Sequence, residues 1–124
     1  YIAKMGSPVV LEQKYKLAEP TLCWEQSVRP ILEGPQAFYN KGQLVMFYAA
    51  NASWAQEYST GLLKLEGSDP LVSENWVKRE RPVFSNAGHG HPIPGSNMFV
   101  CHRKLSGIHG WTDREIVTME LGEL

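Results

Sequence analysis

The chain has 124 residues and a formal net charge of −1, with 12 Lys and Arg residues against 13 Asp and Glu residues. This length supports one small domain with its own core. The basic residues form no cluster, so the charge pattern gives no support for nucleic-acid binding. No apolar run approaches the roughly 20 residues of a membrane span, so the sequence predicts no transmembrane helix.

The two ends of the chain both have the pattern of strands. Residues 1–5 are typical of an edge strand, and residues 116–121 form another strand-like run just before the last residue, Leu124. The chain also begins with Tyr1 rather than Met. We therefore expect the sequence to be a piece of a longer protein.

Residues 6–30 carry weaker signals of regular structure. Pro8, Pro20 and Pro30 interrupt this stretch, and proline breaks both helices and central strands. The pattern predicts a linking segment with one outer strand at residues 9–11.

Residues 31–80 predict four antiparallel strands joined by short turns, and the fold class is therefore all-β. The strands are expected at residues 36–39, 43–49, 60–66 and 76–80. Residues 44–50 are apolar on both faces, so this strand should be covered on both sides. A four-stranded meander of this size is typical of one β-propeller blade. The pattern alone leaves a β-sandwich open as the alternative.

The last third combines a predicted loop with two strands. Residues 81–96 are rich in Gly, His and Pro and are expected to form the loop, with strands at residues 97–102 and 115–121. Cys23 and Cys101 form no CxxC pair. They are predicted to be buried thiols, since free cysteine is often buried.

Glu33 is the candidate catalytic residue that the local sequence itself suggests. It lies in an apolar lead-in directly before Gly34-Pro35 and the first predicted hairpin. A carboxyl group at the mouth of a hairpin can donate a proton if its surroundings favour the protonated form. The alternative is an ordinary solvated carboxylate near a strand end.

Short motifs follow one another along most of the chain. They lie at residues 1–5, 24–25 with 32–35 ("WE…EGP"), 47–54 ("YSAS…W"), 58–65 ("Y.LGLL.L"), 69–84 ("DPL…W.K…PVF"), 88–91 ("GPGH") and 110–114 ("GW.DR"). In this order, the segments resemble the quoted motifs of glycoside hydrolase family 43. The resemblance implies a five-bladed β-propeller, of which this chain would hold one complete blade and parts of its neighbours. Residues 1–30 would end the preceding blade and form a linker, residues 31–80 would form the blade carrying the acid, and residues 81–124 would form part of the final blade.

The family's mechanism implies a role for Glu33 as the general acid that protonates the leaving glycosidic oxygen. Family members invert stereochemistry, so a second carboxylate must activate water from the opposite face, roughly 6.5–9.5 Å away. The family's base and a third acidic residue lie in segments that this chain does not match. Asp69 and Asp113 fall elsewhere in the pattern and are not assigned.

His91 matches the histidine of the "GPGH" element. The resemblance implies that it lies near the propeller axis, contacts substrate and helps to hold a water cluster around a structural calcium ion. No other cofactor is required. The alternative is an ordinary loop histidine. His89, His102 and His109 show no metal-ligand spacing with it and are predicted to be structural or solvated.

Two further residues are candidates for sugar contacts. Trp54 is suited to stacking on a sugar ring, although it is equally suited to packing between blades. Arg114 matches a final-blade arginine that hydrogen-bonds a sugar, and a surface ion pair is the alternative. Trp24, Trp76 and Trp111 are predicted to be packing residues.

The resemblance therefore predicts a glycosidase acting on arabinose- or xylose-containing polysaccharides, with arabinofuranosidase or xylosidase activity. A carbohydrate would be its partner, and secretion would suit such a substrate. We expect the isolated chain to be inactive, because it holds one of the three expected carboxylates. The alternative function is a non-catalytic, carbohydrate-binding propeller piece.

Overall fold

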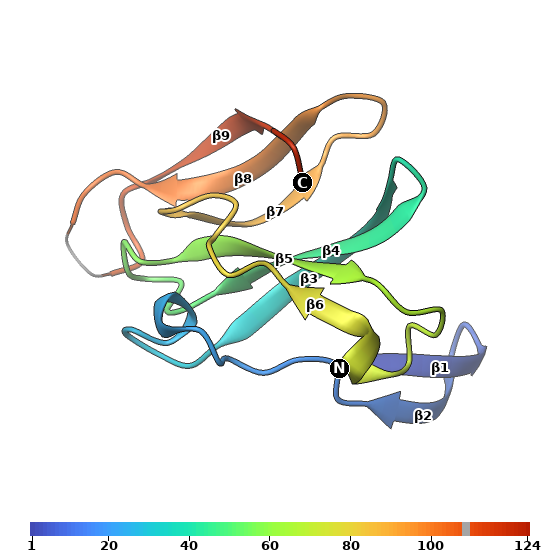
Figure 1. The fold of residues 1–124 in the computed structure, drawn as a ribbon. Helices are drawn as coiled ribbons and strands as arrows, with labels where there is room; N and C mark the ends of the chain where they lie inside the picture. Colours follow the sequence, from blue (N-terminus) through green and yellow to red (C-terminus); the bar gives the residue numbers. More distant parts are fainter. Residues whose placement is uncertain (108–109) are drawn as a thin grey trace.

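A computed structural model describes residues 1–107 and 110–124, which form three antiparallel sheets (Figure 1). The sheets contain β1 (Ile2–Ser7) and β2 (Val10–Tyr15); β3 (Leu32–Asn40), β4 (Gln43–Ala50), β5 (Ser59–Leu65) and β6 (Trp76–Lys78); and β7 (Ala87–Pro92), β8 (Met98–Lys104) and β9 (Arg114–Glu120). Two short 3-10 helices, Cys23–Glu25 and Ser73–Asn75, lie in the connections. No helix in the described ranges is long and apolar enough to cross a membrane.

The middle sheet confirms the predicted four-stranded meander and the all-β class. Its strands follow one another in the order β3-β4-β5-β6. Asn40 pairs with Gln43 across a two-residue turn, in which Lys41 and Gly42 both have positive φ angles of 49° and 86°. This is the turn geometry that matches the twist of two antiparallel strands.

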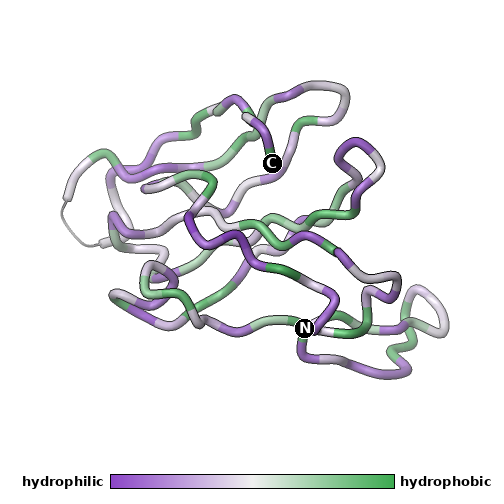
Figure 2. The backbone as a smooth tube through the Cα atoms, in the orientation of Figure 1, coloured by the Kyte–Doolittle hydropathy of each residue, from purple (hydrophilic) through white to green (hydrophobic). Residues whose placement is uncertain are grey.

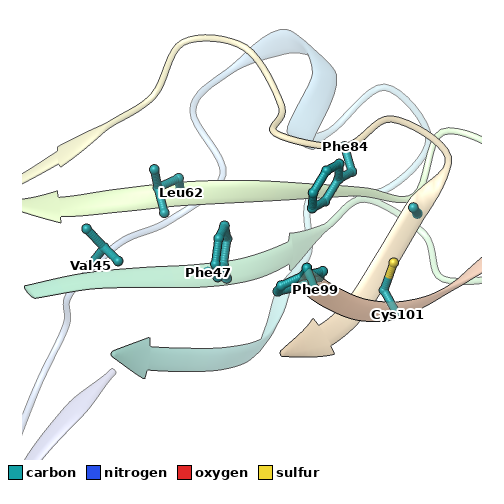
Figure 3. Close-up of a cluster of buried hydrophobic side chains, with 7 residues drawn as sticks. Val45, Phe47, Leu62, Phe84, Phe99 and Cys101 are labelled. Carbon is teal, nitrogen blue, oxygen red and sulfur yellow. The ribbon is translucent and has the colours of Figure 1, made fainter. Parts of the chain in front are cut away.

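One face of the middle sheet packs against the third sheet. Val45 and Phe47 of β4 and Leu62 of β5 form a buried cluster with Phe84 and Phe99 (Figure 3). The Phe47 and Phe99 rings meet edge to face, with their centroids 4.7 Å apart. Burial of this apolar surface and of its aromatic rings holds the two sheets together.

The opposite face of the middle sheet packs against residues 16–31, the leading segment, which connects β2 to β3. Tyr48, Leu63 and Trp76 form a second buried cluster with Leu17, and Trp24 packs against it. Figure 2 shows the hydrophobic stretches along β4 and β5 in the middle of the molecule, with a hydrophilic tip on the β3–β4 hairpin. Strand β4 is therefore covered on both faces, as its sequence predicted.

Two local predictions were wrong, and one predicted strand is longer than expected. The outer strand expected at residues 9–11 is β2, which begins at Val10, extends to Tyr15 and pairs with β1; its remaining residues are mostly polar, so no apolar pattern marked its full length. The loop expected at residues 81–96 contains the strand β7, which pairs with β8. The Gly and His residues of β7 do not give the apolar alternation from which a strand is predicted. Cys23 is exposed, whereas Cys101 is buried as predicted, and both are free thiols.

A buried ion pair ties the leading segment to the middle sheet. The Glu25 carboxylate is completely buried and accepts hydrogen bonds from Lys78 Nζ at 2.7 and 2.9 Å and from the Tyr48 hydroxyl at 2.6 Å. The backbone N–H groups of Thr21 and Leu22 donate to the same carboxylate at 2.7 and 2.9 Å. Five hydrogen bonds from four donor groups thus compensate for the loss of water around one charge.

The balance of these contacts sets the charge of Glu25. Burial raises the pKa of the Glu25 carboxyl, but the hydrogen bonds from Lys78, Tyr48 and the two backbone N–H groups outweigh it, so the pKa is lowered from its ordinary value of 4.5. Glu25 is therefore ionised at neutral pH. Its contacts reach both β4 and β6, which fixes the path of the chain just before β3.

Asn51 anchors the same segment from the end of β4. Its buried side chain accepts hydrogen bonds from the backbone N–H groups of Val28 and Arg29, at 3.1 and 3.0 Å. Its amide donates to the Trp24 carbonyl at 3.0 Å and to the Ser27 hydroxyl at 2.6 Å. An amide with donors and acceptors on one short side chain suits this role in a loop.

We expect Glu25→Gln to lower the free energy of unfolding by about 3 kcal/mol, because it leaves the Lys78 ammonium without its charged partner. This figure is at the low end of the range for a broken buried ion pair, since 16% of the Lys78 side chain is exposed. Urea denaturation of both proteins measures the difference. The control is Glu12→Gln, which breaks the exposed Lys4–Glu12 pair and should have no resolvable effect. Equal losses in the two variants would contradict the role of the buried pair.

The lowered pKa of Glu25 also predicts an acid-sensitive fold. A carboxyl whose pKa is lower in the folded state contributes stability that is fully present above its unfolded value of 4.5 and is lost as the pH falls through its folded value. Denaturation curves between pH 7 and pH 3 should show this loss in the wild-type chain. Glu25→Gln should show a smaller dependence in the acid range, and identical slopes would contradict the prediction.

Candidate functional site

Glu33 lies at the start of β3, next to an irregularity in the strand pairing. It pairs with Ala49, and the register then shifts between Glu33 and Gln36, where Gly34 has a φ angle of 57°. A β-bulge bends the strand and re-aims the neighbouring side chain. The Glu33 side chain is 37% exposed, so it is open to solvent on one side.

Tyr58 connects Glu33 to the third sheet. This residue is only 3% exposed and directly precedes β5. Its hydroxyl donates a hydrogen bond to Glu33 Oε1 at 2.7 Å and lies 3.2 Å from Nδ1 of His89. Burial, followed by the hydrogen bond to the Glu33 carboxylate and its charge, raises the pKa of the Tyr58 hydroxyl far above its ordinary value. Tyr58 is therefore a neutral hydrogen-bond donor at neutral pH.

His89 reaches this site from a second bulged strand. The pairing of β7 with β8 shifts register between Gly88 and His91, and His89 within this irregularity has a φ angle of 52°. A non-glycine residue in that region is uncommon and is often found at functional sites. His89 Nδ1 lies 3.8 Å from Glu33 Oε1, and a Cβ on Gly34 would lie 3.3 Å from the His89 ring. Glycine at position 34 thus makes room for the imidazole.

His102 forms the inner wall of the site. Its ring stacks on Tyr58, with centroids 5.5 Å apart and planes 15° apart, and it also faces His89 at 6.4 Å. Burial lowers the pKa of the His102 imidazole, electrostatic interactions with Arg114 and His89 lower it further, and the interaction with Glu33 opposes them. His102 is therefore neutral at physiological pH.

The structure separates the two histidines of the Gly88–His91 motif. His91 is exposed, and its Nδ1 lies 3.1 Å from the carbonyl oxygen of Pro92. The histidines that join Glu33 are His89 and His102, which the sequence predicted to be structural or solvated. His109, the fourth histidine, lies outside the described residues. A histidine between two glycines was the available sequence signal for His89.

The residues that the structure describes show no cluster of side chains for a calcium ion. Calcium takes six to eight oxygen ligands, several of them from carboxylates or carbonyls. The ranges 1–107 and 110–124 contain no group of three or more His, Cys, Asp or Glu side chains that could hold a metal ion. Calcium near the propeller axis, with His91 acting through water, therefore stays a prediction.

Trp54 and Arg114 lie together beside this cluster. The Trp54 ring is 5.4 Å from that of Trp111, which is 68% exposed and is therefore not the packing residue that the sequence predicted. The Arg114 guanidinium lies 5.4 Å from the Trp111 ring and donates to the Ser53 carbonyl. Its buried Nε has no hydrogen-bond partner among the described residues. Arg114 lines a narrow pocket with Tyr58 and His102, so the aromatic pair adjoins the cluster.

The electrostatic coupling of Glu33 to His102 can be tested by titration. We expect Glu33→Gln to lower the pKa of His102 further, because the substitution removes the negative charge that favours the imidazolium. Arg114→Gln should raise the same pKa. Proton NMR of the histidine rings between pH 4 and pH 8 measures both changes. Arg103→Gln, on an exposed arginine of the same strand as His102, is the control, and a shift as large as that for Arg114→Gln would contradict the assignment.

These observations define a class of protein. Four-stranded and shorter antiparallel sheets pack face to face, and polar side chains gather at the bulged ends of their strands. This is a partial β-propeller, a fold in which several blades surround a central axis.

Comparison with known proteins shows what the chain is similar to. No protein-family model matches the sequence. An extracellular exo-α-(1→5)-L-arabinofuranosidase of Streptomyces avermitilis is 33% identical over 103 residues, which is 81% of this chain and 21% of that protein. The crystal structure of an α-L-arabinofuranosidase from Lactobacillus brevis matches with a TM-score of 0.81 and 26% identity. A thermostable family-43 glycoside hydrolase matches with a TM-score of 0.70 and 25% identity.

The two structural matches each cover 95% of this chain and 42% of the known structure. The chain is therefore a glycoside hydrolase family 43-like segment with a partial propeller fold, as its motifs indicated. It spans less than half the length of these relatives.

Proposed function

We propose that this chain is part of a glycoside hydrolase that cleaves O-glycosidic bonds in arabinose- or xylose-containing polysaccharides, with Glu33 as the general acid. One observation carries the proposal: the half-exposed Glu33 carboxyl is anchored through one oxygen to buried Tyr58, where two sheets meet. The names of the Streptomyces and Lactobacillus relatives support α-L-arabinofuranosides as the first substrates to test.

The proposed reaction is an inverting hydrolysis. Glu33 gives its proton to the glycosidic oxygen as the bond between that oxygen and the anomeric carbon breaks. A second carboxylate removes a proton from water, whose oxygen bonds to the opposite face of the same carbon. We assign this base to no residue of the chain. The proton returns to Glu33 from solvent after the sugar leaves, since its side chain is 37% exposed.

The isolated chain is proposed to be inactive. It covers 42% of the two known structures, and the family pattern places the base and the third acidic residue outside the matching segments. Without a base to activate water, protonation of the leaving oxygen is only half of the required chemistry.

The remaining predicted residues take supporting roles in this proposal. Trp54, with Trp111, supplies aromatic surface for sugar C–H groups, and Arg114 supplies a hydrogen-bond donor beside them. His91 stays a proposed substrate contact or calcium-linked residue, although its described contacts join it to Pro92 rather than to Glu33. We also propose secretion, which the name of the Streptomyces relative supports.

A non-catalytic carbohydrate-binding role is the second candidate. The exposed ring of Trp111 against Trp54 favours it, because aromatic faces bind sugars without any catalytic group. In that case Trp111→Ala would abolish binding of arabino-oligosaccharides, measured by calorimetry, while Glu33→Gln would leave binding intact.

The proposal predicts that the chain alone releases no 4-nitrophenol from 4-nitrophenyl α-L-arabinofuranoside or β-D-xyloside, although its circular dichroism spectrum is that of a folded β protein. A chimera, in which this chain replaces the matching part of the Lactobacillus brevis enzyme, should be active. Glu33→Gln in the chimera should lower kcat by roughly 10²–10⁴. The loss should be larger for an arabino-oligosaccharide than for the nitrophenyl substrate, since nitrophenolate leaves without protonation.

Three results would change the proposal. Activity of the isolated chain that disappears in Glu33→Gln would support Glu33 as the acid. It would overturn the proposal that the isolated chain lacks the groups needed for activity. Full activity of the chimera with Glu33→Gln would overturn the role of Glu33. Product with the retained anomeric configuration, followed by NMR directly after mixing, would overturn the inverting mechanism.

A further inference from the structure

The Tyr58 hydroxyl lies between the Glu33 carboxyl group and the His89 imidazole, and its single proton can be donated to only one of them. It is 2.7 Å from Glu33 Oε1 and 3.2 Å from His89 Nδ1, whereas Glu33 and His89 are 3.8 Å apart and share no direct hydrogen bond. A phenol donates one hydrogen bond and accepts others through its oxygen. The direction of the Tyr58 proton therefore decides how all three side chains are connected.

The donor and acceptor roles follow from the shorter contact. Glu33 Oε1 accepts the hydrogen bond of the Tyr58 hydroxyl at 2.7 Å, so the Tyr58 O–H bond points to Glu33 Oε1. The remaining contact, between His89 Nδ1 and the Tyr58 oxygen, is then a hydrogen bond only if Nδ1 carries the proton. A neutral His89 in this chain of contacts has the proton on Nδ1 and a free lone pair on Nε2.

Tyr58 itself has little freedom to move. Its ring is buried and stacks on His102. On the side of β7, a Cβ added at Gly88 would lie 2.5 Å from Tyr58 Cε1, so the glycine is required for the ring to fit. The backbone N–H of Tyr58 donates to the Ala55 carbonyl at 3.3 Å. The hydroxyl is thus held at a defined point, while Glu33 and His89 are on bulged strands and are both partly exposed.

We infer that Tyr58 is a positioning residue, which fixes the Glu33 carboxyl through Oε1 and sets the Nδ1–H tautomer of His89. In the described residues Glu33 has no hydrogen bond through Oε2, so Oε2 is the oxygen that carries the proton toward a substrate. His89 Nε2 is then the acceptor that the site offers beside it, suited to a hydroxyl group or a water molecule. The catalytic part of this inference rests on the proposed role of Glu33 as the acid, whereas the tautomer of His89 does not.

The tautomer can be measured in the 124-residue chain without any activity. Nitrogen-15 NMR of the histidine side chains, at a pH where they are neutral, distinguishes a protonated Nδ1 from a protonated Nε2. The wild-type chain should show His89 mainly as the Nδ1–H form. Tyr58→Phe removes the acceptor for that proton, and the Nε2–H form that free imidazole prefers should become the major one.

A second variant tests the coupling from the other end. Glu33→Ala removes the carboxylate, so the Tyr58 hydroxyl is free to donate to His89 Nδ1, and the tautomer should again shift to Nε2–H. Tyr39→Phe is the matched control, because Tyr39 is an exposed tyrosine on the same strand as Glu33, and it should leave the His89 tautomer unchanged. Gly88→Ala, which displaces the Tyr58 ring but keeps its hydroxyl, should have the effect of Tyr58→Phe and replaces it if that variant does not fold.

Two results would overturn the part of the inference that concerns His89: a wild-type His89 in the Nε2–H form, or a tautomer that is the same in Glu33→Ala and in wild type. In the Lactobacillus brevis chimera, Tyr58→Phe should lower kcat for an oligosaccharide about tenfold to hundredfold with KM unchanged, as expected for a misplaced catalytic group. An unchanged kcat would overturn the positioning of Glu33. Full activity of the Glu33→Gln chimera would overturn the proposed acid instead and would leave the tautomer result standing.

Discussion

Burial of β4 on both faces is the constraint on which the rest of the structure depends. Val45 and Phe47 face the third sheet, and Tyr48 and Ala50 face the leading segment. A strand with apolar side chains on both faces needs a packed layer on each face to bury them. The third sheet on one side and the leading segment on the other are therefore parts of one packed stack with the middle sheet, which brings the bulged parts of β3 and β7 close enough to share a site.

The leading segment adds polar contacts to this stack. Unlike apolar packing, these contacts require one particular position of the segment on the sheet. Glu25 is buried only because Lys78, Tyr48 and two backbone N–H groups surround its carboxylate. Any shift of the segment along the sheet would leave a charge without partners, at a much greater cost than an imperfect apolar contact. The ion pair and the Asn51 amide thus select one path for the chain into β3, and with it the position of Glu33.

The candidate site lies where regular pairing stops. Glu33 and His89 each adjoin a register shift, and the side chain of each contacts the hydroxyl of the buried Tyr58. Irregular strand ends allow side chains to leave the alternating pattern of the sheet, and the packed ring behind them restores a defined geometry. Glu33 and His89 are therefore partly open to solvent, while the buried Tyr58 fixes their positions.

The sequence by itself determined the all-β class, the four-stranded meander, the double-sided burial of β4 and the likeness to family 43, because alternation and motif order are local properties of the chain. Only the tertiary structure decided which histidine joins Glu33. In a regular strand His89 and His91 would share a face, but the bulge and the left-handed backbone at His89 break the alternation, and no count along the sequence detects that. The burial of Glu25 and the exposure of Cys23 and Trp111 were decided in the same way, because each depends on partners far away in the chain.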